Sequence, residues 1–233
     1  MSAYGDIKAP STNGATLPST IWAIRPNSSS DGYVTLHHLK LSTAQQLPGL
    51  LEHLNTIFAQ VVEDGATYPQ EGEMGREAFE KYFFAADVFV GIVGTARLID
   101  ATAGAAVDIT LEKARANRPW EECIVGYYYV KPNYPGRSSH ICNAGFVVPH
   151  CHRGAGYGKL LAQSYLYYAP RLGYQASVFN LVYVNNLASV KLWEQLGFEK
   201  AGRIPRAGRL RKASGDGEEY VDAWVYYKEF SRE

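Results

Sequence analysis

The spacing of hydrophobic positions predicts two amphipathic helices in the first half of the chain. In residues 47–63 apolar side chains recur at close to the 3.6-residue helical period, and Gly65 follows as a plausible stop. A second helix is expected at about residues 76–85. The apolar positions of the first helix are Leu51, Leu54, Ile57, Phe58 and Val61.

Short apolar runs rich in β-branched and aromatic residues predict strands that surround these helices. A third helix is expected at residues 159–172 and a short fourth helix at 189–197. The order of elements indicates an α+β fold built around a mixed sheet, because helices and strands do not alternate regularly. The expected strands cover residues 21–25, 34–41, 88–93, 124–130, 144–148, 178–184 and 223–228.

Polar segments suggest the domain organisation. Residues 1–19 are rich in Ser, Thr, Pro, Gly and Ala, which predicts a flexible N-terminal tail. Residues 20–233 are expected to form a single domain. Within it, residues 94–121 are polar and are interpreted as an insertion between adjacent strands.

Composition excludes several classes of partner. The 233 residues include 23 basic and 23 acidic side chains, so no net charge draws the chain to nucleic acid or to a membrane. Three cysteines without a C-x-x-C pair suggest neither a disulfide framework nor a metal site. No signal peptide or membrane-spanning run is evident, and a cytoplasmic protein is expected.

The segment from Arg153 to Gly158, R-G-A-G-Y-G, is the most informative motif. It lies between an expected strand and an expected helix, where glycines let backbone N–H groups approach an anion. Arg153 adds a permanent positive charge. Neither the P-loop pattern nor G-x-G-x-x-G fits. The alternative is a glycine-rich turn that binds nothing.

Two motifs together resemble the GCN5-related N-acetyltransferase superfamily. The first is R-x-x-G-x-G at Arg153, and the second is residues 185–198, N-N-L-A-S-V-K-L-W-E-Q-L-G-F, where Asn186 and Ser189 take the Asn and Ala positions of N-x-x-A-x-x-L-Y-x-x-x-G-F. The resemblance implies a central, mostly antiparallel twisted sheet flanked by helices, and acetyl-CoA as co-substrate. The cofactor-binding residues that it implies are Phe146, Val147, Val148, Arg153, Gly154, Ala155, Gly156, Tyr157, Gly158, Lys159 and Asn186.

A closer resemblance, to the fungal L-azetidine-2-carboxylate acetyltransferases, is dense over residues 126–210. It implies acetylation of a small cyclic secondary amino acid, such as azetidine-2-carboxylate or a proline analogue, with roles in detoxification or proline metabolism, and a homodimer. The segments that carry it are Y-V-K-P-N-Y (129–134), C-N-A-G-F (142–146), H-R-G (152–154), F-N-L-V-Y-V-N-N (179–186) and I-P-R-A-G (204–208), with a weaker match at T-Y-P-Q (67–70).

The resemblance also implies how the substrates are held. The N–H of Phe146 would polarise the thioester carbonyl, as an oxyanion-type contact. Asn143 would hold the substrate carboxylate, together with the backbone N–H groups of Asn180 and Leu181. The structural alternatives are core packing for the Phe146 ring and a cross-strand hydrogen bond for Asn143.

Asn186 is the candidate catalytic residue, because the resemblance places its amide near the sulfur of coenzyme A. Many members of the superfamily use a tyrosine in the closing motif, but Trp193 stands at that position and has no acidic proton to give. The alternative role for Asn186 is an N-cap of the following helix. Both roles are compatible.

No general base is identifiable, and His140, His150 and His152 are interpreted as structural or solvated side chains. Cys142 and Cys151 lack a His–acid arrangement, so direct transfer in a ternary complex is expected rather than an acyl-cysteine route. Two alternatives stay open. The same fold could acetylate another amine, such as a polyamine, an antibiotic or a protein N-terminus, or it could bind acyl-CoA without turnover.

Overall fold

The computed structural model describes residues 15–24, 32–94 and 102–230. Most of the expected N-terminal tail, and residues 95–101 of the expected insertion, therefore lie outside the described residues. The other expected elements fall within them and can be compared with the structure.

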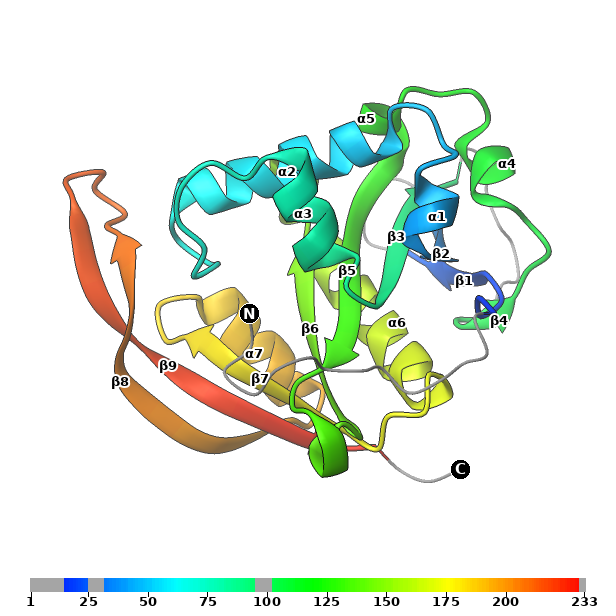
Figure 1. Cartoon of the computed structure of the whole chain (residues 1–233). Coiled ribbons are helices and arrows are strands. Elements are labelled where there is room, and N and C mark those ends of the chain that lie inside the picture. The colour runs from blue at the N-terminus through cyan, green and yellow to red at the C-terminus, as the bar shows by residue number, and fades with distance from the viewer. Residues whose placement is uncertain (1–14, 25–31, 95–101, 231–233) are drawn as a thin grey trace.

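Within the described residues, nine strands form one sheet in the order β4-β1-β2-β3-β5-β6-β7-β9-β8 (Figure 1). Neighbouring strands run antiparallel except β6 and β7, which are parallel, so the expected mixed, mostly antiparallel sheet is confirmed. The strands are β1 (Thr20–Ala23), β2 (Tyr33–Leu39), β3 (Asp87–Val93), β4 (Ala105–Ala106), β5 (Ile124–Pro132), β6 (Ile141–Val147), β7 (Ala176–Tyr183), β8 (Glu199–Arg211) and β9 (Glu218–Glu229).

Helices cover both faces of this sheet. The helices α2 and α3 lie on one face, and α6 and α7 lie on the other (Figure 1). The described helices are α1 (Leu41–Ala44), α2 (Leu50–Asp64), α3 (Arg76–Phe83), α4 (Leu111–Arg115), α5 (Trp120–Cys123), α6 (Tyr157–Arg171) and α7 (Leu187–Gln195).

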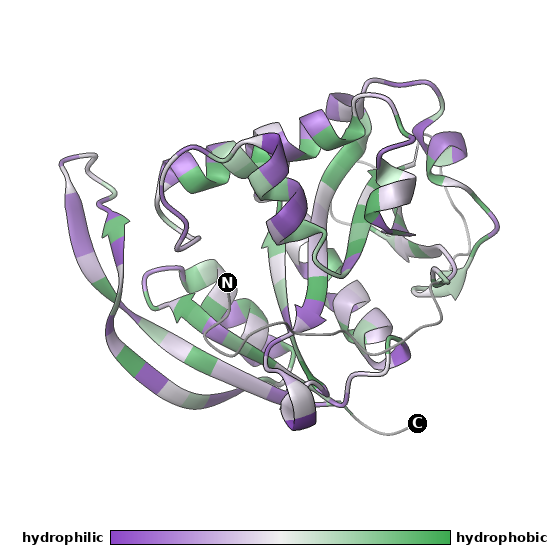
Figure 2. Cartoon of the chain, in the orientation of Figure 1, coloured by the Kyte–Doolittle hydropathy of each residue, from purple (hydrophilic) through white to green (hydrophobic). Residues whose placement is uncertain are grey.

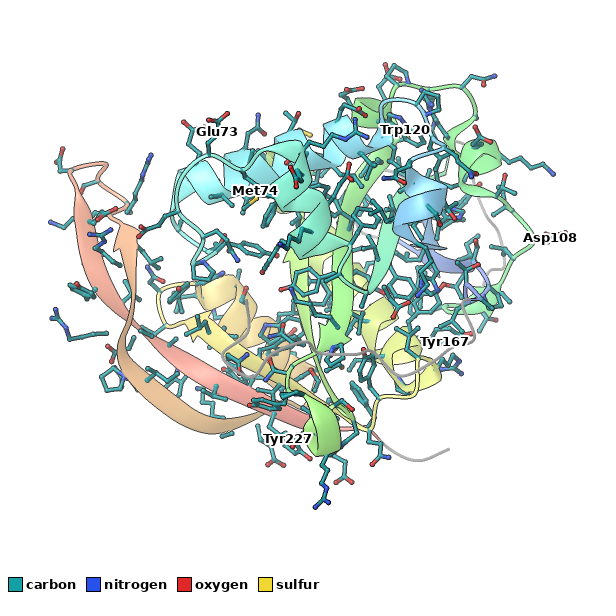
Figure 3. The ribbon with its side chains drawn as sticks, viewed as in Figure 1. Glu73, Met74, Asp108, Trp120, Tyr167 and Tyr227 are labelled. Atoms are coloured by element: carbon teal, nitrogen blue, oxygen red, sulfur yellow. The ribbon has the colours of Figure 1, made fainter. Side chains whose placement is uncertain are left out.

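The tyrosine run in β5 shows how the two faces are built. Successive side chains of a strand point to opposite faces. Tyr127 therefore packs in the core under α2, where its hydroxyl donates to Leu54 O at 2.6 Å. Tyr128 packs under α6, where its hydroxyl lies 3.0 Å from Ser164 Oγ. Side chains crowd the space on both sides of the sheet (Figure 3).

The strand β8 was not expected from the sequence. Most of its thirteen residues are exposed, and it pairs with β9 alone at the edge of the sheet. Its sequence lacks a regular alternating apolar pattern, and the hairpin shows hydrophilic and hydrophobic segments in irregular mixture (Figure 2). In the described part of the 94–121 segment, β4 pairs with β1, and the short helix α4 and the start of α5 follow.

Candidate functional site

The glycine-rich segment connects β6 to α6. Gly154 and Gly156 have φ angles of +79° and +88°, in the left-handed region that glycine adopts without steric penalty. Gly156 is the N-cap of α6, and no side chain caps this helix start. A Cβ atom added at Gly154, Gly156 or Gly158 would meet no heavy atom within 4 Å. Open space therefore borders the first turn of α6.

Backbone donors are available at this helix start. The N–H groups of residues 154–158 donate to no backbone carbonyl in the described part of the chain, whereas Lys159 N–H already bonds Gly156 O at 3.1 Å. Ala155 and Tyr157 thus add their N–H groups to those of the three glycines. Free N–H groups at a helix N-terminus attract anions. The arrangement fits the pyrophosphate of coenzyme A.

Arg153 lies beside this loop and forms an ion pair with an acidic residue. Its Nη2 is 3.6 Å from Oδ2 of Asp64, at the end of α2, and the same oxygen lies 2.9 Å from Nε2 of His150. The Arg153 side chain is 47% exposed, so this ion pair is weak. Arg153 can therefore turn toward an anion bound at the loop.

The strands β6 and β7 separate next to the loop. In the described chain, β6 pairs with β7 only at Ile141 and Cys142, although it stays paired with β5 as far as Val147. Figure 1 shows the two strands diverging. Residues 143–147 therefore have no β7 partner, and the two strands splay apart here.

The strand β7 is irregular at the two residues expected to hold the substrate. Its register with β9 shifts between Phe179 and Val182, so that Asn180 and Leu181 have no Cα partner in the ladder. Such a bulge disrupts ladder hydrogen bonds and re-aims side chains. The irregularity therefore frees this stretch of backbone for other contacts.

Three asparagines meet at the start of the splayed region: Asn143 of β6, Asn180 of β7, and Asn133 directly after β5. Oδ1 of Asn133 accepts from Nδ2 of Asn143 at 2.9 Å and from Nδ2 of Asn180 at 2.6 Å. Nδ2 of Asn133 donates in turn to Oδ1 of Asn180 at 3.1 Å. The cross-strand hydrogen bond considered for Asn143 is thus present. It uses one of the two amide N–H groups, so the other can serve a ligand.

A layer of tyrosines, Tyr129 buried and Tyr68 and Tyr82 half-buried, lies beside residues 145–146 of β6. The Tyr68 hydroxyl donates to the Phe146 carbonyl at 3.1 Å, and the hydroxyls of Tyr82 and Tyr129 are 3.0 Å apart. A Cβ atom at Gly145 would come within 2.7 Å of the Tyr68 hydroxyl. Burial raises the pKa of Tyr68 and Tyr129 well above the ordinary tyrosine value. These hydroxyls therefore stay protonated near neutral pH.

Phe146 has the packing role considered for its ring. Its ring centre lies 5.3 Å from that of Trp193, which itself packs on Phe179 at 4.3 Å. Trp193 is only 6% exposed and belongs to the core under α6 and α7. Val147 is buried and Val148 packs against the same core. Contact with a cofactor from residues 146–148 would therefore involve their backbone.

Asn186 is the N-cap of α7. Its Oδ1 accepts from the N–H of Ser189 at 3.2 Å, which is the capping role considered as the alternative. The cap occupies the amide oxygen and leaves Nδ2 as a donor. The geometry thus allows one side chain to cap the helix and to donate a hydrogen bond elsewhere.

The cysteines do not form a nucleophilic centre. Cys142 is buried, its sulfur lies 3.0 Å from the Tyr165 hydroxyl, and burial raises its pKa to about 12. Cys151 is exposed.

In the described residues, no three His, Cys, Asp or Glu side chains gather as metal ligands. No helix there combines the length and apolar character that crossing a membrane requires.

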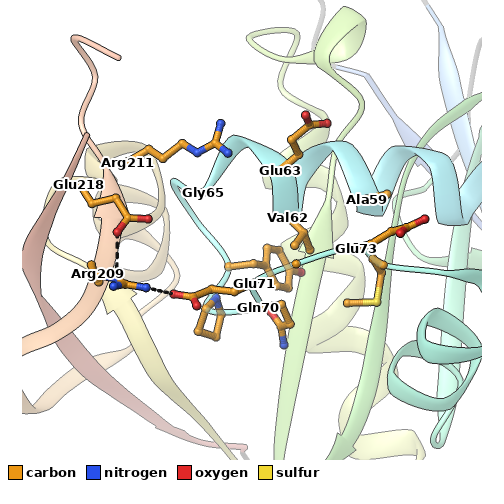
Figure 4. A pocket seen from close by; sticks show the side chains of 14 residues that line it. Ala59, Val62, Glu63, Gly65, Gln70, Glu71, Glu73, Arg209, Arg211 and Glu218 are labelled. Carbon is orange, nitrogen blue, oxygen red and sulfur yellow. Dashed lines mark hydrogen bonds and ion pairs between the residues drawn. The ribbon is translucent and has the colours of Figure 1, made fainter. Parts of the chain in front are cut away.

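A hollow of about 600 Å³ opens between α2, the connection from α2 to α3, and the β8–β9 hairpin (Figure 4). Arg209 of β8 spans it, with Nη2 3.1 Å from Glu71 and Nε 2.9 Å from Glu218. Glu63 and Glu73 also line it. The lining therefore contains more acidic than basic side chains.

Two residues near the splayed strands had no predicted role. Asn133 joins Asn143 to Asn180, and Tyr68 contacts Phe146 from the α2–α3 connection. Both lie in segments that carry the resemblance, Y-V-K-P-N-Y and T-Y-P-Q, but a similar sequence does not show which side chains touch. Only the fold brings them to the asparagine cluster and the splayed strands.

Comparisons with known proteins agree with this geometry. The family model described as the acetyltransferase (GNAT) family matches residues 50–198. The chain is similar to N-acetyltransferase aca1 of Schizosaccharomyces pombe, with 41% identity over 181 residues that cover 78% of this chain and 80% of that protein.

Solved structures share the fold at lower identity. A GCN5-related N-acetyltransferase from Kribbella flavida has a TM-score of 0.60 and 23% identity, covering 84% of this chain and 97% of that one. A GNAT superfamily phosphinothricin acetyltransferase from Sinorhizobium meliloti, solved in complex with AcCoA, also has a TM-score of 0.60, with 16% identity and coverage of 85% and 89%.

Proposed function

Because the chain belongs to the acetyltransferase (GNAT) family and is an N-acetyltransferase, we propose that it acetylates a small cyclic secondary amino acid, L-azetidine-2-carboxylate or a proline analogue. Acetyl-CoA supplies the acetyl group as a thioester. The observation that carries the substrate class is the cluster of Asn133, Asn143 and Asn180 beside the splayed strands. Amide and backbone N–H groups suit a carboxylate.

The cofactor-binding role rests on backbone donors. The N–H groups of residues 154–158, with Arg153 and Lys159 beside them, hold the pyrophosphate. The backbone of Phe146, Val147 and Val148, on the part of β6 without a β7 partner, holds the acetyl carbonyl and the pantetheine arm. The N–H of Phe146 stabilises negative charge that develops on the carbonyl oxygen.

The carboxylate of the amino acid binds at the other end of the splay. It receives the free N–H of Asn143 and the backbone N–H groups of Asn180 and Leu181, which the bulge releases from the ladder. The ring of the amino acid lies against the tyrosine layer of Tyr68 and Tyr129. Orientation of the amine toward the thioester follows from these contacts.

Transfer is direct, in a ternary complex. The amine nitrogen forms a bond to the acetyl carbon, the carbon–sulfur bond breaks, and Nδ2 of Asn186 stabilises the departing thiolate. Its Oδ1 holds the cap meanwhile, which fixes the donor in place. Water removes the proton of the amine. Cys142 takes no part, because a thiol with a pKa of about 12 is not a nucleophile near neutral pH.

We also propose the setting in which this chemistry operates. Residues 20–233 form one domain, and the chain acts in the cytoplasm in detoxification or proline-related metabolism. A homodimer is proposed as well. The exposed edge of β8 supports it, since an unpaired edge strand is a ready surface for another chain.

A larger cationic amine, such as a polyamine, is the second candidate acceptor. The hollow between α2 and the β8–β9 hairpin favours it, because Glu63, Glu71, Glu73 and Glu218 line this hollow. Against it, Arg209 pairs with two of these carboxylates, Glu71 and Glu218, and offsets one of their two charges. The cluster of amide donors also suits an anion better than a cation.

Thiol release from acetyl-CoA tests the proposal, with L-azetidine-2-carboxylate, L-proline, spermidine and a peptide amine as acceptors. Turnover confined to the cyclic amino acids is the expected result. Turnover of spermidine or the peptide alone would discard the substrate class and keep the family. Binding of acetyl-CoA with no turnover of any amine would indicate a binding domain instead.

A further inference from the structure

A lysine lies on the strand next to the asparagine cluster. Lys131 of β5 is the register partner of Asn143 on β6. Directly opposed residues of an antiparallel pair have Cβ atoms about 5 Å apart on one face of the sheet. Asn133, directly after the end of β5, accepts from Nδ2 of Asn143 at 2.9 Å and so lies on the same side. Lys131 therefore borders the proposed carboxylate position.

The ammonium group of Lys131 is half-buried among aromatic rings. Nζ lies 3.9 Å from the ring centre of Tyr82 and 4.1 Å from that of Tyr129, and it donates to Tyr82 O at 3.3 Å. Within the described residues, no carboxylate lies within ion-pair distance of it. Burial lowers its pKa to about 8. Tyr82 and Tyr129 also have raised pKa values, so they supply no negative charge near neutral pH.

This half-buried cation lacks a charge partner among the described residues. A charged group that is removed from water is normally paired with an opposite charge, since desolvation otherwise opposes its charged form. Rings and one carbonyl only partly replace the lost water. An anion placed between Lys131 and Asn143 would complete the arrangement.

We propose that the Lys131 ammonium binds the carboxylate of the acceptor and thereby selects amino acids over amines that lack an acid group. This inference rests on the proposed function and adds the residue that sets its substrate class. The carboxylate lies between Nζ of Lys131 and the free N–H of Asn143. Lys131 touches the substrate but takes no part in bond making.

Acceptors with and without the acid group test this role. L-azetidine-2-carboxylate is compared with L-azetidine-2-carboxamide on wild-type protein and Lys131→Met. Methionine keeps much of the length and removes the charge. We expect kcat/KM for the acid to fall about 10- to 100-fold, as on loss of a hydrogen bond between charged groups, mainly through KM. We expect kcat/KM for L-azetidine-2-carboxamide to change less than about twofold.

Lys228→Met is the matched control. Lys228 also combines a carbonyl contact, Gly197 O at 3.4 Å, with an aromatic ring, Phe198 at 5.9 Å, but it lies on β9. Its loss is expected to leave unchanged the ratio of kcat/KM for the carboxylate to kcat/KM for the carboxamide. An equal loss of acid and amide turnover in Lys131→Met would overturn the proposal and indicate a structural or proton-accepting lysine. Unchanged kinetics would overturn it as well.

Failure of the proposed function appears separately, in the wild-type protein. If wild type acetylates neither compound, the substrate class is wrong and the role of Lys131 falls with it. If wild type acetylates the acid and Lys131→Met lowers kcat/KM equally for the acid and the carboxamide, or for neither, only the inference on Lys131 is wrong.

Calorimetry on wild type provides a test that needs no variant to fold. N-acetyl-L-azetidine-2-carboxylate has no ionisable amine, and its carboxylate is fully charged at pH 8. Binding beside Lys131 raises the pKa of the ammonium, so the complex with coenzyme A takes up protons at pH values around and above the free pKa of about 8. Titrations in buffers with different ionisation heats measure this uptake. No proton uptake would contradict the contact.

Discussion

The donor side and the acceptor side of this site are built in different ways. The proposed pyrophosphate position is formed by one continuous segment, residues 153–159, whose backbone N–H groups carry the function. The proposed acceptor position uses side chains from separate strands and a loop, among them Tyr68, Lys131, Asn143 and Asn180. Backbone chemistry can be local, whereas a pocket for one particular small molecule needs side chains from several directions.

This difference has consequences for mutation. A change in the donor loop should alter the handling of acetyl-CoA whatever the acceptor, since the loop binds the part common to every reaction. A change in the asparagine cluster should alter one class of acceptor and leave acetyl-CoA unaffected. Asn186, whose Nδ2 is proposed to face the sulfur of coenzyme A, should affect the chemical step.

The largest effect is expected at Asn186. Asn186→Asp keeps a side-chain oxygen that caps α7 but removes the Nδ2 donor and adds negative charge near the departing thiolate. We expect kcat to fall about 100-fold or more, as on loss of an oxyanion donor, with little change in the melting temperature. Steady-state kinetics and thermal unfolding measure the two effects. A normal kcat would remove the sulfur contact from the mechanism.

Asn133 should affect the acceptor alone. Asn133→Ala removes the oxygen that receives both Asn143 and Asn180, and we expect KM for the amino acid to rise about tenfold while kcat changes little. Asn133→Asp keeps that oxygen but adds a negative charge. It should bind the amino acid worse than the alanine variant does, because the ligand is an anion. Better binding by the aspartate variant would show that the site takes a cation.

Gly156 should affect the donor alone. Gly156→Ala puts a side chain on a residue with φ +88°, which costs about 1–2 kcal/mol in the left-handed region. We expect KM for acetyl-CoA to rise about fivefold. Gly215→Ala, at φ +81° on the β8–β9 turn, is the matched control with the same backbone penalty and no change in KM. Equal kinetics for the two variants would argue against a pyrophosphate site at this loop.

The smallest effect is expected at Cys151. Cys151→Ser changes an exposed thiol, and both substrates should keep their kinetic constants within about twofold. Mass spectrometry of protein quenched during turnover should find no acetyl group on Cys151 or Cys142. An acetylated cysteine that forms and decays at the rate of turnover would replace direct transfer by a two-step route.

Much of the fold could be predicted from the sequence, because its main elements have periodic apolar patterns. The helices at α2, α3 and α6 and the strands at β3 and β5 all lie within a few residues of their expected positions. The strand β8 could not be predicted in this way. Its exposed, polar residues are held by pairing with β9, and such long-range pairing leaves no local pattern.

The candidate site was predictable in the same uneven manner. The helix cap at Asn186 follows from a local rule, since an asparagine before a helix commonly accepts from the N3 N–H. The link from Asn133 to Asn143 and Asn180 does not, because it depends on the register of β5 with β6 and on the bulge in β7. The same register brings Lys131 opposite Asn143.

A structure of the ternary product complex, with coenzyme A and N-acetyl-L-azetidine-2-carboxylate, tests the division into two sides most directly. We expect the pyrophosphate at the N–H groups of residues 154–158, the sulfur beside Nδ2 of Asn186, and the carboxylate between Asn143 and Lys131. A carboxylate bound in the hollow near Arg209, or a coenzyme A that does not contact the loop, would contradict it.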